Sequence, residues 1–166
     1  MTTSDFSTNL LVDQTPTEAL GAILNMRGWW SEEIEGDTDK LNAIFKYHYK
    51  DIHYCEMKMV TLIPDKKVAW LVLDNRFSFI EDQREWVNSQ LTFDISRKGN
   101  KTEIKFTHVG LSPEDECYDV CQDGWNNYIK NSLRNFITTG KGQPNLKEGG
   151  FNADLAKKWN IETKVA

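Results

Sequence analysis

The sequence alternates apolar and polar residues over several stretches and then changes to a helical period in its last third. The two-residue period of a half-buried strand predicts β-strands at 6–13, 45–50, 53–63, 87–95 and 102–108. A further strand is predicted at 68–73, which is apolar on both faces; we favour Val68, Trp70 and Val72 as its inward side. At 118–139, apolar residues instead recur every three or four positions, as on one face of an amphipathic helix. Gly140 and Pro144 are typical of the end of such a helix.

Two short helical segments are predicted between the first two strands. Thr15 suits the N-cap of a helix, Pro16 its first position, and Glu18 the acidic position of a capping box. This helix ends near Gly28, and residues 29–33 are predicted to form a second short turn of helix. A run of strands followed by one long helix indicates an α+β domain with an antiparallel sheet.

The segment 75–85 is predicted to be a long, charged connection between two strands. It contains Phe77, Phe79 and Ile80 among its charged residues. Because a loop of this length with apolar residues is often a lid or a binding loop, we expect it to border the entrance of a ligand site.

Composition and charge exclude several classes of function. The 166 residues suffice for one domain, and 39% hydrophobic and 27% charged residues are ordinary for a soluble protein. The formal charge of -5 and the lack of a large Lys/Arg cluster argue against a nucleic-acid surface. No apolar run approaches the roughly 18 residues of a membrane span, and the N-terminus lacks a signal-peptide pattern. We expect a cytoplasmic protein with no nucleic-acid partner and no membrane insertion.

The cysteines and acidic groups do not form a recognisable metal site. Cys117 and Cys121 are four residues apart, but no second pair of ligands completes a zinc site, and Cys55 is distant in sequence. The acidic clusters lack the alternation and central glycine of a calcium loop. Phosphate-binding and nucleophile-elbow motifs are absent from the sequence. We therefore expect free thiols, no metal and no cofactor.

Four local motifs occur in an order that resembles a known superfamily. They are Trp29-Trp30, the segments 62–70 and 102–111, and Gly124-Trp125 at the start of the long helix. Together they resemble the START-like (SRPBCC) superfamily, in the branch similar to the C-terminal domain of the activator of the 90-kDa heat-shock-protein ATPase. The resemblance implies a helix-grip fold over about 6–140, in which a curved antiparallel sheet wraps around the long C-terminal helix. We assign 1–142 to this domain and 143–166 to a tail that forms a short docked helix.

Strand alternation and the helical stripe together predict one inward-facing set of side chains. Members of the superfamily bind lipids, hormones or polyketides, so the resemblance implies a cavity between sheet and helix. The composition of the set, aromatic and Met-rich with a few polar tips, is typical of an apolar pocket, although the same residues also suit a closed core. The predicted ligand-binding residues are Phe45, Tyr47, His53, Met57, Met59, Trp70, Phe93, Phe106, His108, Trp125, Tyr128 and Ser132.

Three functions are compatible with these observations. The first is binding of a small hydrophobic or aromatic molecule without catalysis. The second, implied by the resemblance, is a co-chaperone-like domain that contacts a chaperone or another protein. The third is a cyclase-like enzyme that uses His53 or His108 as acid or base, although no partner residue is identifiable for either. The volume of the space under the long helix distinguishes a binding protein from an interaction module.

Overall fold

Six antiparallel strands form one curved sheet in the computed structural model of the protein, which describes residues 5–50, 52–78, 84, 86–113, 115, 117–145 and 150–159. The order across the sheet is β1-β6-β5-β4-β3-β2, and every neighbouring pair is antiparallel. The strands are β1 (Phe6–Val12), β2 (Ile44–Tyr49), β3 (His53–Ile63), β4 (Lys67–Phe77), β5 (Gln90–Lys98) and β6 (Lys101–Val109). The α+β class and the antiparallel sheet predicted from the sequence are confirmed.

The turns between strands follow from residues that accept a left-handed backbone. Asp65 in the β3–β4 turn has φ 63°, and Gly99 in the β5–β6 turn has φ 62°. These are turn positions at which Gly, Asn and Asp are the favoured residues. The strand alternation is retained in β1, where every second side chain from Phe6 to Val12 is buried.

The first helix begins with the predicted capping box. Thr15 Oγ1 accepts a hydrogen bond from the Glu18 amide at 3.1 Å, and a Glu18 carboxylate oxygen accepts one from the Thr15 amide at 3.0 Å. α1 (Pro16–Leu24) is followed by a 3₁₀ turn, η1 (Met26–Gly28). The second helical turn therefore lies just before the two tryptophans, rather than on them as the sequence predicted.

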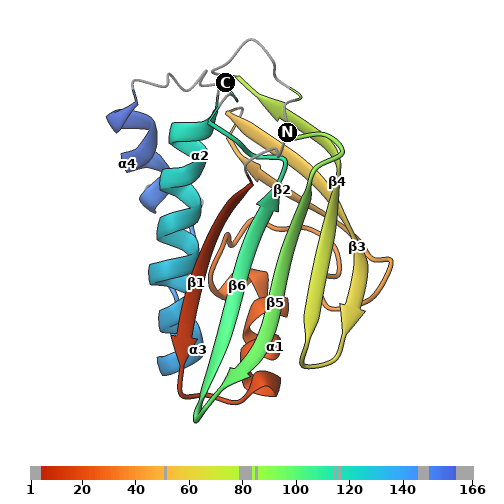
Figure 1. The fold of residues 1–166 in the computed structure, drawn as a ribbon. Coiled ribbons are helices and arrows are strands. Elements are labelled where there is room, and N and C mark those ends of the chain that lie inside the picture. The colour runs from red at the N-terminus through yellow and green to blue at the C-terminus, as the bar shows by residue number, and fades with distance from the viewer. Residues whose placement is uncertain are drawn as a thin grey trace.

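The long C-terminal helix lies along the sheet as one continuous segment (Figure 1). It comprises α2 (Tyr118–Trp125), a π-helical segment η2 (Asn126–Leu133) and α3 (Arg134–Thr139), with right-handed helical dihedrals at both junctions. Gly140 ends it at φ 82°, as predicted. The wider π turn buries adjacent pairs of residues, 128–129 and 132–133, against the interior.

Two predicted boundaries in the middle of the chain are wrong. The strand predicted at 68–73 extends as β4 to Phe77, which pairs with His53 of β3 and is buried. The strand predicted from residue 87 begins only at Gln90, because Trp86 to Asn88 form a turn in which Asn88 has φ 71°. Phe79 and the rest of 79–83 lie outside the described residues.

A final helix, α4 (Gly150–Lys158), packs against α2 (Figure 1). Asp123 of α2 accepts a hydrogen bond from Lys158 Nζ at 2.7 Å and another from Trp159 Nε1 at 3.0 Å. The segment that leads to α4 is held by Asn145, whose amide donates to the Trp30 carbonyl at 2.8 Å. Within the described residues, no helix is both long and apolar enough to cross a membrane.

Replacing Gly142 with alanine is expected to lower the free energy of unfolding by about 1–3 kcal/mol. A methyl group at this position would clash with the Gly28 carbonyl oxygen and lie 3.1 Å from the Ser132 carbonyl oxygen, and both are backbone atoms rather than the end of a flexible side chain. Urea denaturation measures the change. Gly21→Ala is the control, because a Cβ there meets nothing within 4 Å; an equal effect of the two substitutions would contradict the packing argument.

Candidate functional site

Trp29 and Trp30 fill most of the space between the sheet and the long helix. Both are buried, at 0% and 3% exposure. The Trp30 ring stacks on Tyr47 with centroids 4.6 Å apart and lies 5.2 Å from the Trp125 ring. The sequence prediction missed this role, although two consecutive tryptophans are too apolar to expect in a solvent-exposed turn. The cavity expected between sheet and helix is therefore confined to the part of that space that Trp30 borders.

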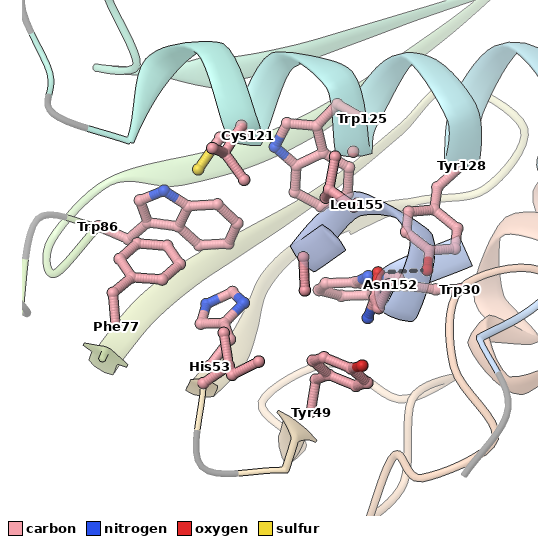
Figure 2. Close-up of a pocket in the computed structure, with 14 residues that line it drawn as sticks. Trp30, Tyr49, His53, Phe77, Trp86, Cys121, Trp125, Tyr128, Asn152 and Leu155 are labelled. Atoms are coloured by element: carbon pink, nitrogen blue, oxygen red, sulfur yellow. Dashed lines mark hydrogen bonds between the residues drawn. The ribbon is translucent and has the colours of Figure 1, made fainter. Parts of the chain in front are cut away.

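The remaining cavity has a volume of about 80 Å³ and lies along α2, between the sheet, the long helix and α4. Figure 2 shows aromatic rings facing one another across it, with α4 closing one side. Its lining consists of Trp30, Tyr49, Ile52, His53, Phe77, Trp86, Val120, Cys121, Gly124, Trp125, Tyr128, Asn152, Leu155 and Ala156.

The structure brings three of the predicted ligand residues to this cavity, namely His53, Trp125 and Tyr128. Others are fully buried apolar side chains in the packed core, at 0% exposure: Phe45, Met57, Met59, Trp70, Phe93 and Phe106. Tyr47, His108 and Ser132 are buried and hydrogen-bonded to other groups of the protein. Most of the predicted set therefore packs against itself, and α4 supplies cavity residues that the sequence prediction omitted.

A buried polar group from α4 connects the sheet to the long helix. Asn152 Nδ2 donates to the Tyr47 hydroxyl at 2.8 Å. Tyr128 donates its hydroxyl proton to Asn152 Oδ1 at 2.7 Å, the hydrogen bond drawn in Figure 2. Burial raises the pKa of both tyrosines, so both hydroxyls stay protonated. This Tyr–Asn–Tyr triad (Tyr47, Asn152, Tyr128) fixes α4 over the cavity. The composition of the tail gave no signal for it.

Both ring nitrogens of His108 form hydrogen bonds within the protein. Trp125 Nε1 can only donate, and it lies 3.1 Å from His108 Nδ1, so Nδ1 is unprotonated. His108 Nε2 then donates to Ser89 Oγ at 3.0 Å, and Ser89 donates to the Trp86 carbonyl. Burial, and then the charge of His53, lower the pKa of His108 to about 3. A neutral histidine with no free nitrogen is poorly suited to acid–base catalysis.

His53 differs from His108 because only one of its ring nitrogens forms a hydrogen bond with a described residue. Its Nε2 lies 2.8 Å from Asn75 Oδ1, while no hydrogen bond to Nδ1 is formed by any described residue. The ring stacks on Phe77 at 4.2 Å and meets the Trp86 ring edge-on at 4.8 Å. Burial lowers the pKa of His53 to about 4, and the hydrogen bond that His53 donates to Asn75 opposes this shift only in part. His53 is therefore a neutral, rigidly held group in the cavity wall.

The cysteines are buried free thiols. Cys117 Sγ accepts a hydrogen bond from Trp86 Nε1 at 3.4 Å, and burial raises the pKa of the Cys55 thiol well above its usual value. High thiol pKa and burial both disfavour a reactive thiolate. In the part of the chain that the structure describes, no three His, Cys, Asp or Glu residues cluster as a metal site would require.

Gly124→Ala is expected to raise the free energy of unfolding by about 0.5–1 kcal/mol, because alanine favours a helix interior over glycine by about that amount. Gly124 lines the cavity, and an added Cβ would lie 3.9 Å from Leu155 Cδ2, an ordinary van der Waals distance. Thermal and urea denaturation check the gain. A loss of stability would mean that α4 packs more tightly on α2 than the structure shows.

No protein-family model matches the sequence, and no curated protein matches it either. Among solved structures, the Aha1 dimer from Colwellia psychrerythraea is similar over 84% of this chain and 99% of that chain, with 20% identity and a TM-score of 0.67. CalU16 from Micromonospora echinospora is similar over 84% of this chain and 68% of its own, with 12% identity and a TM-score of 0.60.

DynU16, from the dynemicin biosynthetic locus, is similar over 83% of this chain and 48% of its own, with 12% identity and a TM-score of 0.61. At these identities the likeness establishes the fold. The chain shares the helix-grip fold with the Aha1 dimer, CalU16 and DynU16, as the four sequence motifs implied.

Proposed function

We propose that the protein binds a small hydrophobic or aromatic molecule in the cavity beneath α4 and performs no chemistry on it. The observation that carries the proposal is the wall of the cavity, which is built from the rings of Trp30, His53, Phe77, Trp86 and Trp125. Apolar walls with a few convergent polar groups are typical of small-molecule sites. The START-like fold of the chain supports the same function.

The volume of the cavity implies that α4 shifts when a ligand enters. An apolar cavity of about 150 Å³ accommodates benzene, whereas this one has about 80 Å³. Leu155 and Ala156 of α4 form part of the wall, so a small outward shift of α4 enlarges the space. The ion pair between Lys158 and Asp123 is partly exposed and opposes that shift only weakly. The Tyr–Asn–Tyr triad is the stronger restraint.

The histidines support binding without catalysis. His108 uses both nitrogens within the protein, and the pKa of His53 near 4 leaves it a weak base at neutral pH. A general base works best when its pKa lies near the operating pH. Binding without turnover therefore accounts for both residues more simply than a cyclase-like reaction.

Thermal denaturation with indole, flavonoids, polyketide-like aromatics and long-chain lipids tests the proposal. A ligand that binds only the folded state raises the melting temperature by mass action when its concentration exceeds its dissociation constant. Ala156→Leu, which fills the cavity, is expected to abolish the shift, whereas Lys157→Leu adds the same side chain to the exposed face of α4 and should preserve it. No shift with any of the four classes would remove the proposal.

A second candidate is a co-chaperone-like protein-interaction domain. The edge strand β2 carries Ile44 at 49% exposure, next to Leu41 at 50%, and two neighbouring exposed apolar side chains at a sheet edge suit a partner surface. The structural similarity of the chain to the Aha1 dimer is compatible with this function. Stimulation of the 90-kDa heat-shock ATPase by the protein, and its loss in Ile44→Lys, would favour this candidate over ligand binding.

A further inference from the structure

His53 places a hydrogen-bonding atom in the wall of a mostly apolar cavity. Figure 2 shows its ring directed from the end of β3 into the space bordered by Phe77, Trp86 and Trp125. Stacking on Phe77 and edge contact with Trp86 hold the ring plane in place, and the hydrogen bond from Nε2 to Asn75 fixes its rotation. The ring is therefore positioned before any ligand arrives.

The hydrogen-bond partner of His53 Nε2 determines whether Nδ1 is a donor or an acceptor. Asn75 Oδ1 is an acceptor, so the 2.8 Å contact requires the hydrogen on Nε2, and the neutral ring then presents a lone pair at Nδ1. Three other groups of the cavity wall direct their hydrogens elsewhere: Trp86 Nε1 donates to Cys117, Trp125 Nε1 to His108, and the Tyr128 hydroxyl to Asn152. No described residue donates to His53 Nδ1.

We infer that the ligand is a flat apolar molecule carrying one hydroxyl or N–H group, and that His53 Nδ1 accepts the hydrogen bond from this group. The inference rests on the proposed function and specifies its ligand. Pairing a buried acceptor improves affinity, whereas leaving it unpaired costs free energy, so the acceptor selects for a donor-bearing ligand. His53 is a specificity residue here, with no part in bond making or breaking.

Three one-ring probes of similar size test the inference: phenol donates a hydrogen bond, anisole only accepts one, and toluene does neither. Water solvates phenol better than toluene, so the two affinities are not compared directly. The informative quantity is the phenol-to-toluene affinity ratio, compared between the unaltered protein and a variant. NMR titration at pH 7.5, where His53 is neutral, measures each affinity. His53→Phe is expected to lower the phenol-to-toluene ratio about 3- to 10-fold, the equivalent of one hydrogen bond.

His48→Phe is the matched control, since His48 lies in β2 outside the cavity wall and the substitution should leave the ratio unchanged. The anisole-to-toluene ratio should also be unchanged in His53→Phe. A second readout uses the unaltered protein: the ¹⁵N resonance of His53 Nδ1 should shift upfield when phenol is added, and not when toluene is added. This readout decides the matter if His53→Phe fails to fold.

Several results would overturn the inference. An unchanged phenol-to-toluene ratio, or an Nδ1 resonance insensitive to phenol, would show that His53 accepts no hydrogen bond from the ligand. An equal drop of the anisole-to-toluene ratio in His53→Phe would show that His53 acts through the shape of the cavity. A preference for anisole over toluene that persists in His53→Phe would assign the polar contact to a hydrogen-bond donor such as the Trp30 indole. In each case the probes still bind and the proposed function stands. If none of the three binds, the proposed function itself fails.

Discussion

Trp30→Ala is expected to lower the free energy of unfolding by about 3–5 kcal/mol, the usual cost of truncating a buried tryptophan to alanine. Trp30 is 3% exposed and contacts the rings of Tyr47 and Trp125, which come from the sheet and the long helix. Its removal leaves a void continuous with the existing cavity, which Trp30 also lines. Urea denaturation measures the loss, and added indole should recover part of it by filling the void.

Trp159→Ala is the control for this experiment, because Trp159 is 38% exposed on the surface of the protein. Trp70→Ala should match the large effect, since Trp70 is fully buried in the packed core. A loss below about 1 kcal/mol for Trp30→Ala would show that its ring does not fill the space under the helix.

Acid is expected to destabilise the protein between pH 6.5 and pH 4, a window that begins above the range in which most carboxylates titrate. The pKa values of His53 and His108 in the folded protein are about 4 and about 3, below the ordinary 6.5, mainly because burial disfavours the charged ring. The unfolded chain therefore binds more protons in this window, and stability is lost as the pH falls through it. Each histidine should remove about 2 kcal/mol between pH 8 and pH 5.

Urea denaturation at pH 8, 6 and 5 measures this dependence. His108→Gln is expected to be less stable at pH 8, because the Trp125 and Ser89 contacts are altered, yet to lose only about half as much stability on acidification. His48→Gln should retain the full dependence. If wild-type protein and His108→Gln lose equal stability between pH 8 and pH 5, then His108 is accessible to protons in the folded state.

The architecture was predictable because its signals are local. The capping box at Thr15, the turn at Gly99 and the helix end at Gly140 each depend on a few neighbouring residues, and each forms as predicted. The failures also have a local cause. The strand predicted from residue 87 begins only after Asn88, which adopts a positive φ. The turn at this position directs the Trp86 side chain into the core. A strand pattern alone does not show such a bend.

The site was less predictable because it depends on side-chain volumes brought together from distant segments. Strand alternation identified the inward face correctly at Phe45 and Tyr47, but it could not show that Trp30, from a turn, occupies the space beside that face. Asn152 is equally remote, lying more than a hundred residues after Tyr47, to which it donates a hydrogen bond. An inward face therefore predicts burial and leaves open whether a cavity remains.

The tryptophans around the cavity also give the protein a built-in optical signal. Trp30 and Trp125 have ring centroids 5.2 Å apart, and Trp86 and Trp125 lie 5.7 Å apart with an interplanar angle of 16°. At such separations the electronic transitions of indole rings couple through space, and the coupling depends steeply on mutual orientation. Near-ultraviolet circular dichroism of the unlabelled protein should therefore record any displacement of these rings, including one too small to alter helix content.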